Sequence, residues 1–142
     1  MKKYFIYKNK KTNEIKVYIA KTDSDIERVT DILKDETSGY TNIHTFADND
    51  MFFTMLIVGL NRMLNEIGSP VLFTKDKISN DRRICLNVKL ANERFIDSCI
   101  LNMSNEFWAI IEDVLTTFEL DFNYNNTRSC IFISKKEAYY ET

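Results

Sequence analysis

The alternation of apolar and polar residues near the start of the chain predicts an antiparallel hairpin. Residues 3–8 and 14–20 are rich in apolar side chains, and they flank the polar segment 9–13. The second run has the period-2 pattern of a half-buried strand. Its alternating apolar positions are Ile15, Val17 and Ile19.

A helix is predicted directly after this hairpin. Ser24 and Glu27 have the spacing of a capping box, in which each side chain satisfies a backbone amide at the helix start. The helical spacing of the apolar residues that follow predicts a helix over 25–36, closed by Gly39. Residues 41–46 are interpreted as a strand.

The most apolar stretch of the chain predicts a buried helix over about 50–67. Residues 51–61 are eleven uncharged residues, whereas a membrane span needs about 20. Asp48, Asn49 and Asp50 are candidates for its N-cap, and Gly68 has the position of a C-terminal stop. The first half of this helix is apolar on all sides, which indicates burial on more than one side.

The remaining chain predicts strands joined by short turns and one further helix. Ser104 is the expected N-cap of a helix over 105–118, whose apolar residues recur at helical spacing. The segment 93–101 is compatible with a helix or a strand, and the preceding strand favours a second strand. Residues 75–82 are expected to be a polar loop. The other expected strands are 71–74, 84–90, 120–124 and 127–134, and the last of these should be central because CIFI is apolar on both faces.

These elements predict a single α+β domain over 1–142. Its strands follow one another in hairpins, so we expect a mixed or mainly antiparallel sheet packed by about three helices. Low Pro and Gly content argues against a linker. The N-terminal apolar run ends after four residues, which is too short for a signal peptide. Together with three scattered cysteines, this predicts a cytoplasmic protein with three free thiols.

The basic residues are concentrated in two segments, which suggests an anion site. Residues 1–21 carry seven Lys and one Glu, and residues 67–90 carry five basic and two acidic residues. Because a guanidinium group can donate two hydrogen bonds to one phosphate, the arginines in and beyond the second segment are the first candidates for anion ligands. Solvated loops would explain the same pattern. The candidate anion ligands are Lys75, Lys77, Arg82, Arg83 and Arg128.

The residues that usually carry catalysis are sparse. His44 is the only histidine and has no nucleophile beside it, so a structural role is the favoured interpretation. No metal-ligand spacing and no glycine-rich phosphate loop is present, and we therefore expect no metal, no cofactor and no enzymatic activity. A sequence pI of about 5.5 without a basic recognition helix also argues against duplex nucleic acid.

The apolar helix also predicts self-association. Either the domain itself or a second subunit must cover it. The sheet can cover one side, but the two other helices present single apolar stripes and give limited cover, and monomers rarely leave an apolar patch open. We expect a homo-oligomer, in particular a two-fold dimer. The interface candidates are Met51, Met55, Val58 and the aromatic residue Trp108.

Two function hypotheses remain, with an enzyme of unknown class as a third. The first is a non-catalytic binding or inhibitor protein of bacterial or phage accessory type, anti-defence or immunity-like, that acts by occupying a partner protein. Its support is the small size, the Lys-, Asn- and Ile-rich composition and the uneven charge. The alternative is a protein that sequesters a small phosphate-bearing ligand, such as a nucleotide, at a subunit interface.

Overall fold

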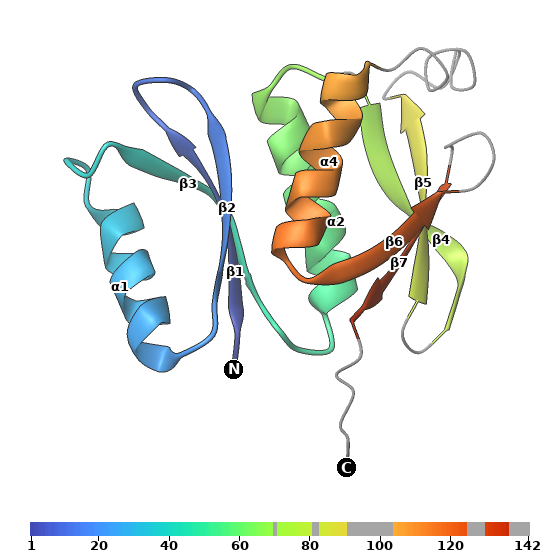
Figure 1. Ribbon diagram of the computed structural model, residues 1–142, viewed down its shortest axis with the longest axis horizontal. Helices are drawn as coiled ribbons and strands as arrows, with labels where there is room; N and C mark the ends of the chain where they lie inside the picture. Colours follow the sequence, from blue (N-terminus) through green and yellow to red (C-terminus); the bar gives the residue numbers. More distant parts are fainter. Residues whose placement is uncertain (70, 81–82, 91–103, 125–129, 137–142) are drawn as a thin grey trace. The chain divides into compact units, whose positions relative to one another are not determined.

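The protein is described by a computed structural model (Figure 1) that covers all residues except 70, 81–82, 91–103, 125–129 and 137–142. For 76–80 and 83–90 it describes the backbone only. The chain groups into two compact units, Met1–Ser69 and Pro70–Thr142. The predicted α+β class is confirmed: helices pack against antiparallel sheets in both units. That the two units make one domain stays a prediction.

The first unit is built on a three-stranded antiparallel sheet. The strands β1 (Lys3–Asn9), β2 (Ile15–Ala20) and β3 (Tyr40–Ala47) lie in the order β2-β1-β3. The predicted hairpin and the strand expected at 41–46 are therefore confirmed. β1 is central, and its successive side chains point to opposite faces, so both faces of the sheet can carry a helix.

The helix α1 (Asp23–Lys34) covers one face of this sheet, around the buried side chains of Phe5, Ala20 and Val29. The prediction that Ser24 caps the helix is wrong. Thr22 is the N-cap, and its Oγ1 accepts a hydrogen bond from the Asp25 amide at 3.2 Å. Both Thr and Ser are preferred N-cap residues, so the sequence spacing alone did not distinguish them.

The helix α2 (Phe52–Glu66) packs on the other face, where its Phe52 ring contacts the ring of Tyr4. The helix begins after the three predicted N-cap residues, 48–50. The side-chain oxygen of Asn49 instead accepts a hydrogen bond from the Met51 amide and closes a turn before the helix. Gly68 does end it, with a φ of 72° and the paired hydrogen bonds of a Schellman motif. None of residues 52–60 is exposed. No helix in the described part of the chain is long and apolar enough to cross a membrane.

The second unit has a four-stranded antiparallel sheet in the order β4-β5-β7-β6. β7 (Cys130–Lys135) lies between β5 (Arg83–Leu90) and β6 (Leu120–Tyr124), which confirms that CIFI is central. The polar loop predicted at 75–82 is wrong in part, because β4 (Val71–Asn80) continues through most of it. The ambiguous segment 93–101 lies outside the described residues.

The helix α4 (Asn105–Thr117) packs against β6. Its predicted N-cap is confirmed, since Ser104 Oγ accepts the Phe107 amide at 3.1 Å. The Tyr124 hydroxyl donates to Glu112 Oε2 at 2.6 Å, which fixes the helix to the end of β6. Its core-facing side chains are buried, and they are Phe107, Trp108, Ile111, Val114 and Leu115.

Candidate functional site

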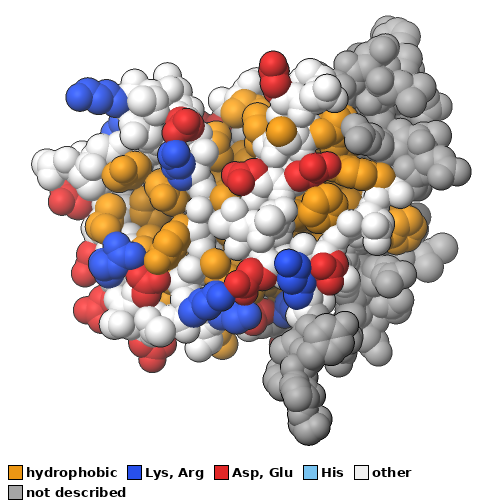
Figure 2. Space-filling model, viewed as in Figure 1, with side chains coloured by type: hydrophobic (Ala, Val, Ile, Leu, Met, Phe, Trp, Pro, Cys, Tyr) orange, Lys and Arg blue, Asp and Glu red, His pale blue; other side chains and the backbone are white. Residues whose placement is uncertain are grey.

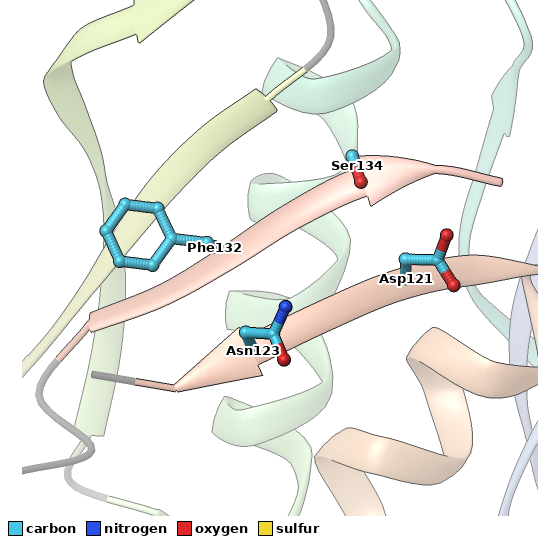
Figure 3. Close-up of a pocket in the computed structure, with 4 residues that line it drawn as sticks. All are labelled: Asp121, Asn123, Phe132 and Ser134. Carbon is cyan, nitrogen blue, oxygen red and sulfur yellow. The ribbon is translucent and has the colours of Figure 1, made fainter. Parts of the chain in front are cut away.

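A pocket of about 170 Å³ lies on the β6–β7 hairpin. Figure 3 shows its four lining side chains, two from each strand, on neighbouring positions of the sheet. Asp121 pairs with Ser134 in the strand register, and Asn123 pairs with Phe132. The lining is therefore two adjacent rows of one sheet face.

Strand alternation explains why these side chains reach solvent. Leu120 is buried, and Phe122 and Tyr124 are half-buried on one side of β6, whereas Asp121 and Asn123 are exposed on the other side. In β7, Ile131 and Ile133 are fully buried and Phe132 between them is 39% exposed. The hairpin thus turns its apolar face inward and presents a polar face with one aromatic ring.

The pocket offers more hydrogen-bond acceptors than donors. The Asp121 carboxylate accepts only, while the Asn123 amide and the Ser134 hydroxyl can accept or donate. None of the four lining residues carries a positive charge. A chemical group that binds in this pocket would combine N–H donors, for the acceptors of the lining, with an apolar part that packs on the Phe132 ring.

The predicted anion ligands are only partly described. Lys75 is exposed on β4, and Lys77 lies further along the same strand. Arg83 is the first residue of β5, and its backbone pairs with Asn80 and Ser134. Since Ser134 lines the pocket, one of the predicted cations lies next to a lining residue in the sheet. Arg82 and Arg128 lie outside the described residues. Whether the five side chains converge stays a prediction.

The predicted interface residues differ in exposure. Met51 is 53% exposed, and Met55 and Val58 are half-buried. Trp108 is only 3% exposed and makes edge-to-face contacts with Phe107 and Tyr124, so its ring is already used within its own unit. Trp108 is therefore corrected as an interface candidate, because both aromatic residues at the start of α4 are buried within their own unit.

His44 is a buried residue with both ring nitrogens in contact with polar groups. Its Nε2 lies 3.0 Å from the Met55 carbonyl oxygen, and its Nδ1 lies 3.2 Å from Arg62 Nη1. Because a carbonyl only accepts, Nε2 carries the proton and Nδ1 accepts from the guanidinium. Burial, followed by the charge of Arg62, lowers the pKa of His44. This geometry agrees with the predicted structural role.

The cysteine prediction requires a correction. Cys130 is buried in β7 and is disulfide-bonded, which contradicts the expectation of three free thiols. Three scattered cysteines gave no sign of this bond, because sequence spacing does not show which residues lie close together in the fold. The described part of the chain contains no group of three or more His, Cys, Asp and Glu side chains arranged to hold a metal ion.

No protein-family model, no curated protein and no solved structure matches this chain.

Proposed function

We propose that the protein is a non-catalytic binding protein of bacterial or phage accessory type that acts by occupying a partner protein through the outer face of the β6–β7 hairpin. The observation that carries this proposal is the exposure of Phe132. Its neighbours Ile131 and Ile133 are fully buried, yet Phe132 is 39% exposed beside a pocket of polar side chains. Aromatic anchors with a polar rim are typical of protein interfaces.

We infer the chemistry of the partner from the lining residues. Asp121 supplies a negative charge, and Asn123 and Ser134 add hydrogen-bonding groups within the same two rows. A partner surface with a Lys or Arg next to an apolar side chain would satisfy the carboxylate and cover the ring at the same time. The net charge of −2 favours encounter with a basic surface.

The test is the affinity for a purified partner. A partner captured by cross-linking from an extract of the source cells would be purified and titrated against the wild-type chain and Phe132→Ala. We expect Phe132→Ala to weaken binding by about 30-fold or more, which corresponds to the roughly 2 kcal/mol of an interface hot spot.

The matched control is Ile32→Ala, which removes a side chain of similar exposure, 37%, from α1 in the other unit. This variant should bind as tightly as the wild-type chain. The proposal fails if Phe132→Ala and Ile32→Ala bind the partner equally well while both remain folded.

A second candidate function is the sequestration of a small phosphate-bearing ligand. One observation favours it: Arg83 pairs with the lining residue Ser134, which brings a cation position next to the pocket. A nucleotide at 100 times its Kd would then stabilise the fold by about 2.7 kcal/mol. Arg83→Ala should abolish the rise in melting temperature, and no rise with any nucleotide would exclude this candidate.

We also propose a cytoplasmic location. The disulfide at Cys130 weighs against it, because the cytosol keeps most thiols reduced. Labelling of free thiols in intact source cells would test this: a reduced Cys130 in the cell supports the cytoplasmic location.

A further inference from the structure

The strand β2 is an edge strand of the first unit. The sheet order is β2-β1-β3, and no described strand pairs with the outer side of β2. An edge strand presents a row of backbone N–H and C=O groups that can pair with another chain. Figure 2 shows hydrophobic side chains gathering at the surface of this unit beside β2 and α1.

The hydrogen-bond pattern of the hairpin identifies which residues point their backbone groups outward. The Asn9 amide donates to the Glu14 carbonyl at 3.0 Å, so this pair is a hydrogen-bonded pair. Such pairs alternate along an antiparallel ladder, so every second residue of β2 bonds to β1. The N–H and C=O groups that point away from β1 belong to the intervening residues, Ile15, Val17 and Ile19.

The side chains of this edge are suited to association. β2 has the sequence IKVYIA, with one charged residue and no Pro, and its register with β1 is unbroken. In natural proteins, charged residues, Pro or bulges in an edge strand usually prevent it from pairing with another chain. The opposite edge has such a device: Ile6 and Tyr7 pair with His44 and Asn42, which leaves Ile43 as an extra residue in β3.

We propose that two copies of the chain associate by antiparallel pairing of β2 with β2, around a two-fold axis that passes through Val17. This joins the two three-stranded sheets into one. A two-fold axis perpendicular to the sheet keeps like faces together, so each outward residue pairs with another outward residue. Val17 pairs with its own copy and Ile15 pairs with Ile19, which uses all three outward backbone positions.

The charges on the other face of the strand complement each other in this register. Lys16 of one copy lies opposite Tyr18 of the second copy, and cross-strand neighbours of this kind lie within side-chain contact. The Tyr18 hydroxyl donates to the Asp25 carboxylate at 2.7 Å. Lys16, which pairs with Glu14 of its own copy at 2.6 Å, therefore meets the aromatic ring of Tyr18, and such a ring favours a cation. The Asp25 carboxylate also pairs with Arg28, at 2.6 Å.

This interface differs from the one expected at Met51, Met55 and Val58, and it does not depend on the β6–β7 pocket. The pairing surface lies in the first unit and Phe132 in the second. A failed partner-binding experiment would therefore leave this inference standing, and a monomeric chain would leave the partner proposal standing.

The mass of the full chain in solution is the first test. Light scattering from low to high micromolar concentration should approach twice the 16.7 kDa of one chain. Val17→Lys sets two ammonium groups against each other on the axis and should give the single-chain mass. Asn42→Lys, on the opposite edge, should leave the dimer intact. A single-chain mass for the wild-type chain at every concentration would overturn the inference.

Cysteine substitution tests the register and does not rely on the charged variant folding. A hydrogen-bonded pair has a Cα–Cα distance of about 5.5 Å, which a disulfide can bridge. Val17→Cys should therefore form covalent dimers under mild oxidation well above the wild-type background. Lys16→Cys and Tyr18→Cys should not. Equal cross-linking at all three positions, or none at Val17→Cys, would contradict the proposed pairing.

Discussion

At the scale of single residues, the contacts between His44 and α2 explain why the only histidine has a structural role. A lone histidine without a nucleophile beside it indicated a structural role. The structure supplies the reason: both ring nitrogens contact polar groups, and the ring stacks on Phe46 at 5.3 Å between centroids. The contacts with Met55 and Arg62 could not be predicted, because they depend on how α2 lies on the sheet.

The lowered pKa of His44 predicts a loss of stability at mildly acidic pH. In the unfolded chain the imidazole titrates near 6.5, whereas burial and Arg62 lower its pKa in the fold. The unfolded state therefore binds more protons below about pH 6.5, and the free energy of unfolding falls as the pH decreases from about 6.5 to the lower folded pKa, where the loss is complete. Above about pH 6.5 both states are neutral at this position, and the term vanishes.

Urea denaturation at a series of pH values checks this prediction. His44→Gln cannot titrate but can still donate to a carbonyl, so it should lose the pH dependence that begins below about pH 6.5. The pKa values of Asp25 and Asp35 are lowered from 3.8, so these carboxylates titrate at lower pH than the unfolded imidazole. Identical pH profiles for the wild-type chain and His44→Gln would contradict the assignment.

Gly59 makes the approach of His44 to the helix possible. A Cβ at this position would lie 2.7 Å from His44 Cδ2 and 3.1 Å from Ile6 Cδ1. Gly59→Ala would gain about 1 kcal/mol of helix propensity, but overpacking of this kind costs about 1–3 kcal/mol. We expect a net loss of stability in chemical denaturation. The loss should shrink in a His44→Ala background, where the nearest clash is absent, and a Gly59→Ala chain more stable than wild type would refute this account.

At the scale of elements, the apolar periodicity predicted helices and hairpins well, and their ends less well. α4 begins at the predicted Ser104, and CIFI forms the central strand β7 as its two apolar faces require. The polar end of β4 was predicted as a loop because polar residues in a strand have no periodic signature. Its pairing with β5 depends on backbone register, which the sequence pattern does not encode.

The start of α1 provides a direct test of the cap assignment. Thr22 Oγ1 accepts the Asp25 amide at 3.2 Å, whereas Ser24 contacts only the Thr22 hydroxyl, at 3.3 Å. Thr22→Ala should lower the free energy of unfolding by about 1 kcal/mol, the usual cost of losing an N-cap. Ser24→Ala should have a much smaller effect. Equal losses, or a larger loss for Ser24→Ala, would restore the capping box predicted from the sequence.

At the scale of the whole molecule, none of the four residues that line the candidate site was predicted from the sequence. The alternation of Asp121 and Asn123 with apolar neighbours in LDFNY is a signal that could have predicted a polar outer face on that strand. Phe132 was missed, because a residue in an apolar run was assumed to be buried on either face. Only the structure shows that the outer face of β7 remains exposed at this ring.

The apolar first half of α2 illustrates the opposite case. Because this half is apolar on all sides, we expected other parts of the protein to bury every side of it, and a second copy of the chain to bury part. Residues 52–60 are all buried or half-buried in a single copy, so the exposed remainder that motivated an interface at Met51, Met55 and Val58 is small. Self-association through β2 rests on a different property, an unprotected strand edge, which appears only once sheet order is known.

Hydrogen exchange of the free chain and of its complex with the purified partner tests the proposed function most directly. Backbone amides of an occupied surface exchange more slowly, and this measurement requires no substitution in the chain. We predict that binding slows exchange in Leu120–Tyr124 and Cys130–Lys135, the two strands that carry the pocket. Protection confined to Met1–Ser69, with β6 and β7 unchanged, would contradict a partner site on this hairpin.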